Sequence, residues 1–172
     1  MLDRIERTVA SPGLIGIYAA TVQKVHQDGR LDVTVPAIYD QTAPESCATA
    51  RPCFPYAHFF VPKEGDLVWV AFEGGDPDAP VWLGAWYAKD SVPKEADADP
   101  PVKRVIKTPA GHLVILDDTK DKEQVIVADK TGNRIELRTD GVLIKCAQNL
   151  TIDASGKQIE IKASSVAVTK SP

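Results

Sequence analysis

The chain has 172 residues and a formal net charge of −4, divided unevenly: residues 1–100 hold 15 acidic and 8 basic side chains, and residues 101–172 hold 9 and 12. The acidic first half argues against nucleic-acid binding, because clustered Lys and Arg provide most of the affinity for phosphate backbones. No apolar run approaches the roughly 20 residues of a membrane helix, and three cysteines are too few for a disulfide framework.

Abundant Pro, Gly and β-branched residues, without any long segment of helical periodicity, predict an all-β fold. Residues 1–15 form no clear element and are predicted to be an N-terminal arm. Residues 16–25 and 31–35 alternate in polarity and flank an Asp-Gly turn, which predicts a β-hairpin. Residues 41–50 are small and polar and predict a loop. Residues 52–61 predict a bent or edge strand interrupted by Pro55.

The clearest hairpin spans residues 66–87. Val68, Val70 and Phe72 alternate with outward residues, and residues 73–80 supply the Gly, Asp and Pro of a tight turn. Five short strands before residue 90 predict a small closed barrel of the OB type, although the pattern alone does not distinguish it from an SH3-like barrel. The residues predicted to fill the barrel or to contact a neighbouring barrel are Val68, Trp69, Val70, Phe72, Trp82 and Trp86.

Residues 91–101 (SVPKEADADPP) are predicted to be a linker between the barrel (residues 16–90) and a second region (residues 102–172). In that region apolar residues recur in pairs two positions apart, separated by turn residues and charges. This spacing predicts a ladder of short strands. The pairs are Val125/Val127, Ile135/Leu137, Val142/Ile144, Leu150/Ile152, Ile159/Ile161 and Val166/Val168.

A single copy of this ladder cannot bury its own apolar side chains. Burial contributes about 25 cal/mol per Å² of apolar surface, whereas ordering costs about 1–2 kcal/mol per residue of backbone entropy. Several copies wound together would bring their apolar stripes onto one axis and remove exposed strand edges. The predicted axial core is Ile135, Leu137, Val142, Ile144, Leu150, Ile152, Ile159, Ile161, Val166 and Val168.

Few residues suggest catalysis or metal binding. His112 has no second His beside it, and Asp76 and Asp78 are better explained as turn residues that bond their own backbone. Ser11 and Ser46 have no partners for nucleophilic catalysis. We therefore predict no catalytic residue, no metal site and no cofactor. The tryptophans could instead form a stacking platform for sugars or single strands, as in other OB folds.

Five stretches carry a family resemblance: residues 16–25 (GIYAATVQKV), 28–37 (DGRLDVTVPA), 63–84 (KEGDLVWVAFEGGDPDAPVWLG), 106–118 (IKTPAGHLVILDD) and 131–137 (TGNRIEL). They resemble the baseplate assembly protein V and Gp5-like spike proteins of phage tails, which are related to the C-terminal part of type VI valine-glycine repeat spikes. The resemblance implies that the barrels form a ring and that three C-terminal regions intertwine into a β-helical needle. The expectation of three chains comes from this resemblance, because the spacing of apolar pairs predicts only that several copies assemble.

The resemblance implies a structural spike of a contractile injection machine, connecting a hub to a membrane-piercing needle and tip. An eleven-residue linker stands where related spikes carry a lysozyme domain, so no enzymatic activity is expected. No His-x-His iron-binding tip or fused hub domain is recognisable, so separate hub and tip proteins are expected partners. Assembly is expected in the bacterial cytoplasm, the final location in a tail baseplate or injection particle, and contact with the target membrane only on injection.

The alternative function is an OB-type module that binds oligosaccharide or single-stranded nucleic acid and carries an oligomerising β tail. Saturable, salt-sensitive binding to such polymers would favour it over the spike.

Overall fold

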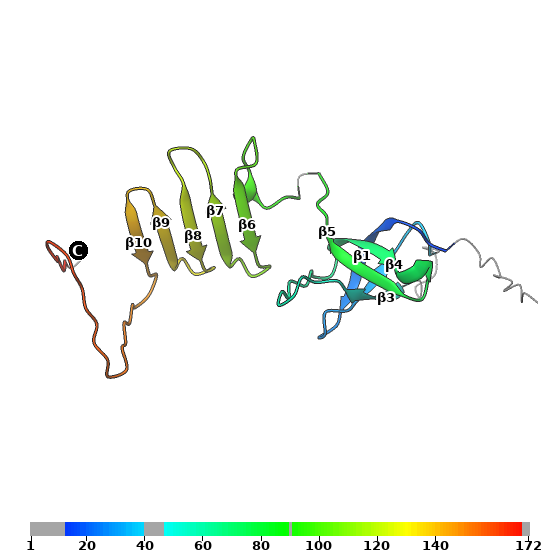
Figure 1. Cartoon of the computed structure of the whole chain (residues 1–172), viewed down its shortest axis with the longest axis horizontal. Helices are drawn as coiled ribbons and strands as arrows, with labels where there is room; N and C mark the ends of the chain where they lie inside the picture. Colours follow the sequence, from blue (N-terminus) through cyan, green and yellow to red (C-terminus); the bar gives the residue numbers. More distant parts are fainter. Residues whose placement is uncertain (1–12, 40–46, 90, 170–172) are drawn as a thin grey trace, which may run out of the picture. The chain divides into compact units, whose positions relative to one another are not determined.

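The regular secondary structure of the described residues consists of β-strands apart from two three-residue 3₁₀ helices, which confirms the all-β prediction (Figure 1). The computed structural model describes residues 13–39, 47–89 and 91–169. The chain divides into two compact units, residues 1–101 and residues 102–172, each considered by itself below. Most of the predicted N-terminal arm lies outside the described residues.

The first unit is a closed five-stranded barrel with the strand order β1-β2-β3-β5-β4. Its strands are β1 (Ile17–Val25), β2 (Leu31–Thr34), β3 (Cys47–Pro52), β4 (Leu67–Phe72) and β5 (Pro80–Ala85). All neighbouring pairs are antiparallel except β3 and β5, which run parallel and close the barrel. This closed five-stranded arrangement is the predicted OB-type architecture.

Alternating side chains fill the barrel interior with apolar groups. The core consists of Ala20, Val22, Leu31, Val33, Val35, Ala50, Val68, Val70, Phe72 and Trp82. Trp82 is the largest of these, and its indole Nε1 donates a hydrogen bond to the Gly29 carbonyl oxygen at 3.0 Å. The Phe54 ring meets the Trp82 ring edge-on, with centroids 4.9 Å apart. The barrel therefore completes its core within one chain.

The third strand was predicted at the wrong place. It spans Cys47–Pro52, within and just after the segment predicted as a loop, whereas residues 53–61 contain no strand. Small residues fit here because Ala50 is fully buried opposite Leu31. The apolar residues that follow form a loop in which Ala57 has a φ of 61°. Phe54 packs from this loop on the core without joining the sheet.

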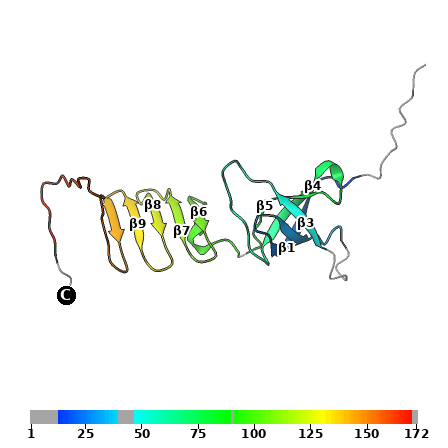
Figure 2. The same ribbon diagram turned by 90° about the horizontal axis from the view of Figure 1, so that it is seen from below.

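The second unit is an antiparallel meander whose strands are neighbours in chain order (Figures 1 and 2). Its strands are β6 (Lys103–Lys107), β7 (Leu113–Asp117), β8 (Gln124–Ala128), β9 (Arg134–Arg138) and β10 (Gly141–Lys145). Of the six predicted ladder pairs, the first three lie on β8, β9 and β10. Residues 146–169 contain no strand within a single chain, so the last three pairs do not form strands there.

The role of Trp82 generates a stability prediction. Trp82→Phe removes the Nε1 hydrogen bond but keeps an aromatic ring, and should lower the free energy of unfolding of the barrel by about 1–2 kcal/mol. Trp82→Ala also leaves a cavity and should cost about 3–5 kcal/mol. The measurement is urea unfolding followed by circular dichroism. The exposed change Gln23→Ala on β1 should stay within about 0.5 kcal/mol, and equal losses for all three variants would contradict the assigned core.

Candidate self-assembly surface

The register of the meander sorts its side chains onto two faces of different character. One face, the apolar face, contains two rows of residues that run across all five strands. The first row is Ile106, Val114, Val127, Ile135 and Ile144. The second row is Arg104, Leu116, Val125, Leu137 and Val142. Nine of these ten residues are apolar, and the exception lies on the edge strand β6.

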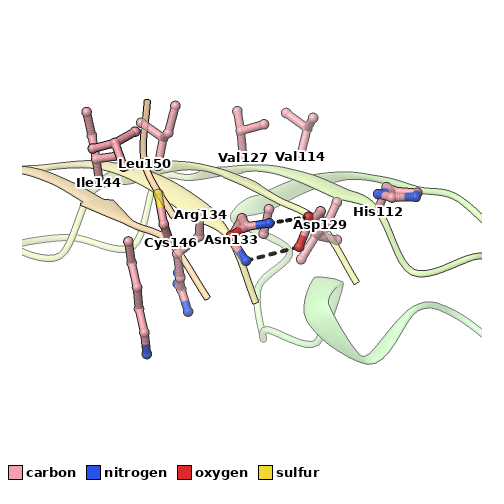
Figure 3. A pocket seen from close by; sticks show the side chains of 13 residues that line it. His112, Val114, Val127, Asp129, Asn133, Arg134, Ile144, Cys146 and Leu150 are labelled. Atoms are coloured by element: carbon pink, nitrogen blue, oxygen red, sulfur yellow. Dashed lines mark hydrogen bonds between the residues drawn. The ribbon is translucent and has the colours of Figure 1, made fainter. Parts of the chain in front are cut away.

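The apolar face is exposed to solvent in a single chain. Val142 is 65% exposed, Ile144 56% and Val127 49%, and Ile106, Leu116, Ile135 and Leu137 are exposed to similar extents. Figure 3 shows Val114, Val127 and Ile144 projecting from the same side of the sheet, with Leu150 beside them. A contiguous apolar surface of this kind marks an interaction site rather than a solvated wall.

The opposite face carries most of the charge of the sheet. Its central row is Val105, Ile115, Ile126, Glu136 and Leu143, and its outer rows include Lys103, Asp117, Arg138, Arg134 and Lys145. Glu136 is only 2% exposed, because the guanidinium groups of Arg134 and Arg138 on the same strand pair with its carboxylate. Charged groups are therefore paired or solvated here, and the apolar face, with Arg104 at its edge, is the one that needs a partner.

A hydrogen-bonded loop between β8 and β9 fixes where the chain leaves the sheet. The Asp129 carboxylate accepts bonds from the Thr131 amide at 2.7 Å and from the Asn133 amide and side chain at 3.0 and 2.7 Å. Asn133 Oδ1 in turn accepts a bond from the Ala147 amide at 2.8 Å. The Thr131 hydroxyl and then the Asn133 side chain hold the pKa of the Asp129 carboxyl far below its ordinary value of 3.8.

This loop borders a shallow recess of about 490 Å³ at the ends of β7 to β10 (Figure 3). On the side of the apolar face the recess is lined by Val114, Val127, Ile135, Ile144 and Leu150. The Asn133 bond to Ala147 places Leu150 beside Ile144 as the chain leaves β10. The recess thus extends the apolar face and suits an apolar side chain better than a polar ligand.

The structure brings together part of the predicted axial core. Ile135, Leu137, Val142 and Ile144 share the apolar face, and Leu150 borders it. The other predicted axial residues, which follow Leu150, lie in no strand and are exposed. They are Ile152, Ile159, Ile161, Val166 and Val168, with exposures from 49% to 95%.

The sequence analysis missed half of the apolar face. Ile106, Val114, Leu116, Val125 and Val127 belong to it but were not included in the axial core. The available signal was the alternation in residues 113–117 (LVILD) and the Val125/Val127 pair, which continues the same ladder. The lysines and arginine of β6 hide its alternation, so this strand carried no clear signal.

The predicted barrel residues divide between the interior and the outer wall. Val68, Val70, Phe72 and Trp82 are buried in the core. Trp69 lies on the outside of β4, where its ring centroid is 5.6 Å from that of Trp86. The first group stabilises the barrel, whereas the Trp69–Trp86 pair is available for an intermolecular contact.

The other chemical candidates show no assembled site. Asp76 Oδ1 accepts a bond from the Asp78 amide at 2.9 Å, which is a turn contact. Ser11 and Ser46 lie outside the described residues. Among the described residues, no three His, Cys, Asp or Glu side chains are grouped as a metal site. In the same part of the chain, no helix has the length and apolar character to cross a membrane.

Comparison with known proteins finds a matching family model for each of the two units. Residues 15–87 match the family model described as the OB domain of type VI secretion system and phage-baseplate injectors. Residues 103–170 match the model of the phage baseplate V C-terminal trimerisation domain. The two matches cover the barrel and the meander with the segment that follows it. No curated protein matches the chain.

The Asp129 network generates a prediction about pH. Because the pKa of Asp129 is lowered on folding, its carboxylate should stabilise the loop at every pH above 3.8, and this contribution should disappear as the pH falls through the lowered value. Asp129→Ala should speed amide hydrogen exchange at Thr131, Asn133 and Ala147 at neutral pH. Asp140→Ala, in the next turn, should leave those amides unchanged. Equal exchange in both variants would show that the network does not fix the loop.

Proposed function

Because the chain belongs to the phage baseplate V spike family, as residues 16–25, 63–84 and 106–118 predicted, we propose that it is the structural central spike of a contractile injection machine. Three copies would form a ring of barrels above a needle built from residues 102–172. The needle would transmit the axial force of contraction to the target envelope. The observation that carries this proposal is the exposed apolar face of the meander, which a single chain leaves uncovered.

A homotrimer accounts for both incomplete features of the second unit. Three apolar faces turned toward a common axis would cover one another, and each fully covered Val, Leu or Ile contributes about 1.5–3 kcal/mol. The segment after β10 would find its partner strands on neighbouring copies, which would place Ile152, Ile159 and Ile161 on the axis. The match to a trimerisation domain supports three copies in particular.

The proposed action is mechanical, and it needs stiffness rather than chemistry. A closed prism of paired strands has no free edge and satisfies its backbone hydrogen bonds, so compression must break many bonds together. The charged face, where Glu136 pairs with Arg134 and Arg138 and is already buried within one chain, would form the outer wall. In this proposal the spike has no catalytic step, and it joins a separate hub protein to a separate tip protein.

The axial position of Ile152 generates the first test. Ile152 lies outside the barrel and is 66% exposed in a single chain, so Ile152→Asp should leave the barrel folded. In the trimer it would bury three unpaired charges at a cost of several kcal/mol per ion, and should abolish assembly. Size-exclusion chromatography and SDS–PAGE without boiling would report the trimer. Thr151→Asp, one residue earlier and on the opposite side of the predicted strand, is the matched control and should leave the trimer intact. An SDS-resistant Ile152→Asp trimer would contradict the axial placement.

The function itself is tested on assembled particles. Quantitative mass spectrometry of sheath-and-tube particles from cells that express the chain should find about three copies per particle. Cells that produce only the Ile152→Asp variant should lack functional particles, whereas cells with Thr151→Asp should retain them. If the chain is absent from purified particles, or if purified protein clears peptidoglycan in a zymogram, the proposal of a purely structural spike is wrong.

A further inference from the structure

The outer wall of the barrel has a polar side and an uncharged side. On β2 and β3 the outward residues are polar or charged: Asp32, Thr34, Cys47, Thr49 and Arg51. Near the end of β1, Lys24 lies opposite Asp32 and belongs to the polar side. The other outward residues that pair across β1, β4 and β5 carry no charge. They are Ile17, Ala19, Thr21, Leu67, Trp69, Ala71, Val81 and Leu83, and we call this surface the tryptophan wall.

The tryptophan wall is continuous across three strands. Ile17 lies opposite Ala71, which lies opposite Val81, and Ala19 lies opposite Trp69. Ile17 is 57% exposed and Leu83 43%. The Trp86 ring packs on Trp69, and within the described residues its indole Nε1 is buried without a hydrogen-bond acceptor. A buried donor of this kind is unusual. The exposed uncharged side chains of the wall, such as Ile17 and Leu83, are what indicate a partner.

A second uncharged surface is the loop that follows β3. Residues 52–62 contain no charged side chain, and Tyr56, Phe59 and Phe60 are 98%, 63% and 58% exposed. Phe54 anchors this aromatic loop, because its ring packs on Trp82 and lies close to Gly29 together with Phe59. Three aromatic rings are thus held outward on a fixed base.

We propose that the aromatic loop of one copy packs on the tryptophan wall of the next copy around the threefold axis. The inference rests on the homotrimer of the proposed function. In a ring, each subunit contact joins two different surfaces, and the barrel offers two uncharged surfaces on different elements. This pairing is the arrangement that removes both from water.

Because the linker tethers the barrels, even a small contact between them can form in the trimer. Residues 88–101, which include the linker, extend to at most about 50 Å, so the three barrels of one trimer are confined together. Tethering of this kind gives an effective concentration in the millimolar range, and a contact that is weak between free barrels becomes occupied in the trimer. The polar wall of β2 and β3 remains in solvent, where Asp32 accepts a hydrogen bond from Thr49 at 2.7 Å.

Disulfide cross-linking of the full chain tests the contact. In a background where Cys47, Cys53 and Cys146 are changed to Ser, Tyr56→Cys is combined with Leu83→Cys on the tryptophan wall. The matched control combines Tyr56→Cys with Thr49→Cys on the polar wall. Mild oxidation with oxidised glutathione should link the first pair into covalent dimers and trimers on SDS–PAGE. The control should cross-link about tenfold less. Some cross-linking is expected even there, because tethering alone brings the barrels near each other.

Three outcomes would overturn the proposal. Cross-linking by Tyr56→Cys alone would show that loops meet loops, and cross-linking by Leu83→Cys alone would show that walls meet walls. Equal, weak cross-linking of both pairs would show that the two surfaces do not pack on each other and would indicate that another protein covers them. Light scattering of the same variants before oxidation separates the two proposals. A three-chain mass without the cross-link rejects this interface only, whereas a single-chain mass also rejects the spike.

Discussion

The second half of this protein depends on one constraint: a single-layer sheet must place alternate side chains on a face that its own chain does not cover. Nine apolar residues lie on that face of β6 to β10, about half exposed, and the residues after β10 add further exposed apolar side chains. An apolar face of this size left in water marks an interaction site, and the unit matches a trimerisation domain. Other copies of the chain must supply the missing layer.

The barrel meets the same demand in a different way. By closing on itself it buries Leu31, Val33, Val68 and Val70 completely within one chain. Its remaining apolar groups, on the tryptophan wall and the aromatic loop, are outside this core. The protein thus combines a barrel whose core lies within one chain with a sheet whose apolar face is uncovered in a single chain, and the sheet is the part that matches a trimerisation domain.

The sequence predicted the parts in which alternation, turns and core formation coincide. The strands β1, β2, β4 and β5 were found because apolar residues alternate beside Gly-rich turns, and four residues of the apolar face were found from the spacing of the ladder. Strand β3 was missed because Ala48 and Ala50 are small. Strand β6 was missed because its Lys and Arg mask the alternation. In the sequence, Asp129, Thr131 and Asn133 are turn residues between two pairs of the ladder. Only the folded chain shows that Asn133 also accepts a hydrogen bond from the Ala147 amide.

The strands predicted around Ile152, Ile159 and Ile161 depend on partners that a single chain does not contain. The molar mass of the protein in solution therefore shows whether these partners are present. Multi-angle light scattering over a dilution series into the micromolar range should give three times the chain mass of 18.6 kDa at every concentration. A compact, folded species of one chain mass would contradict the account, because the apolar face would then be stable in water without a partner.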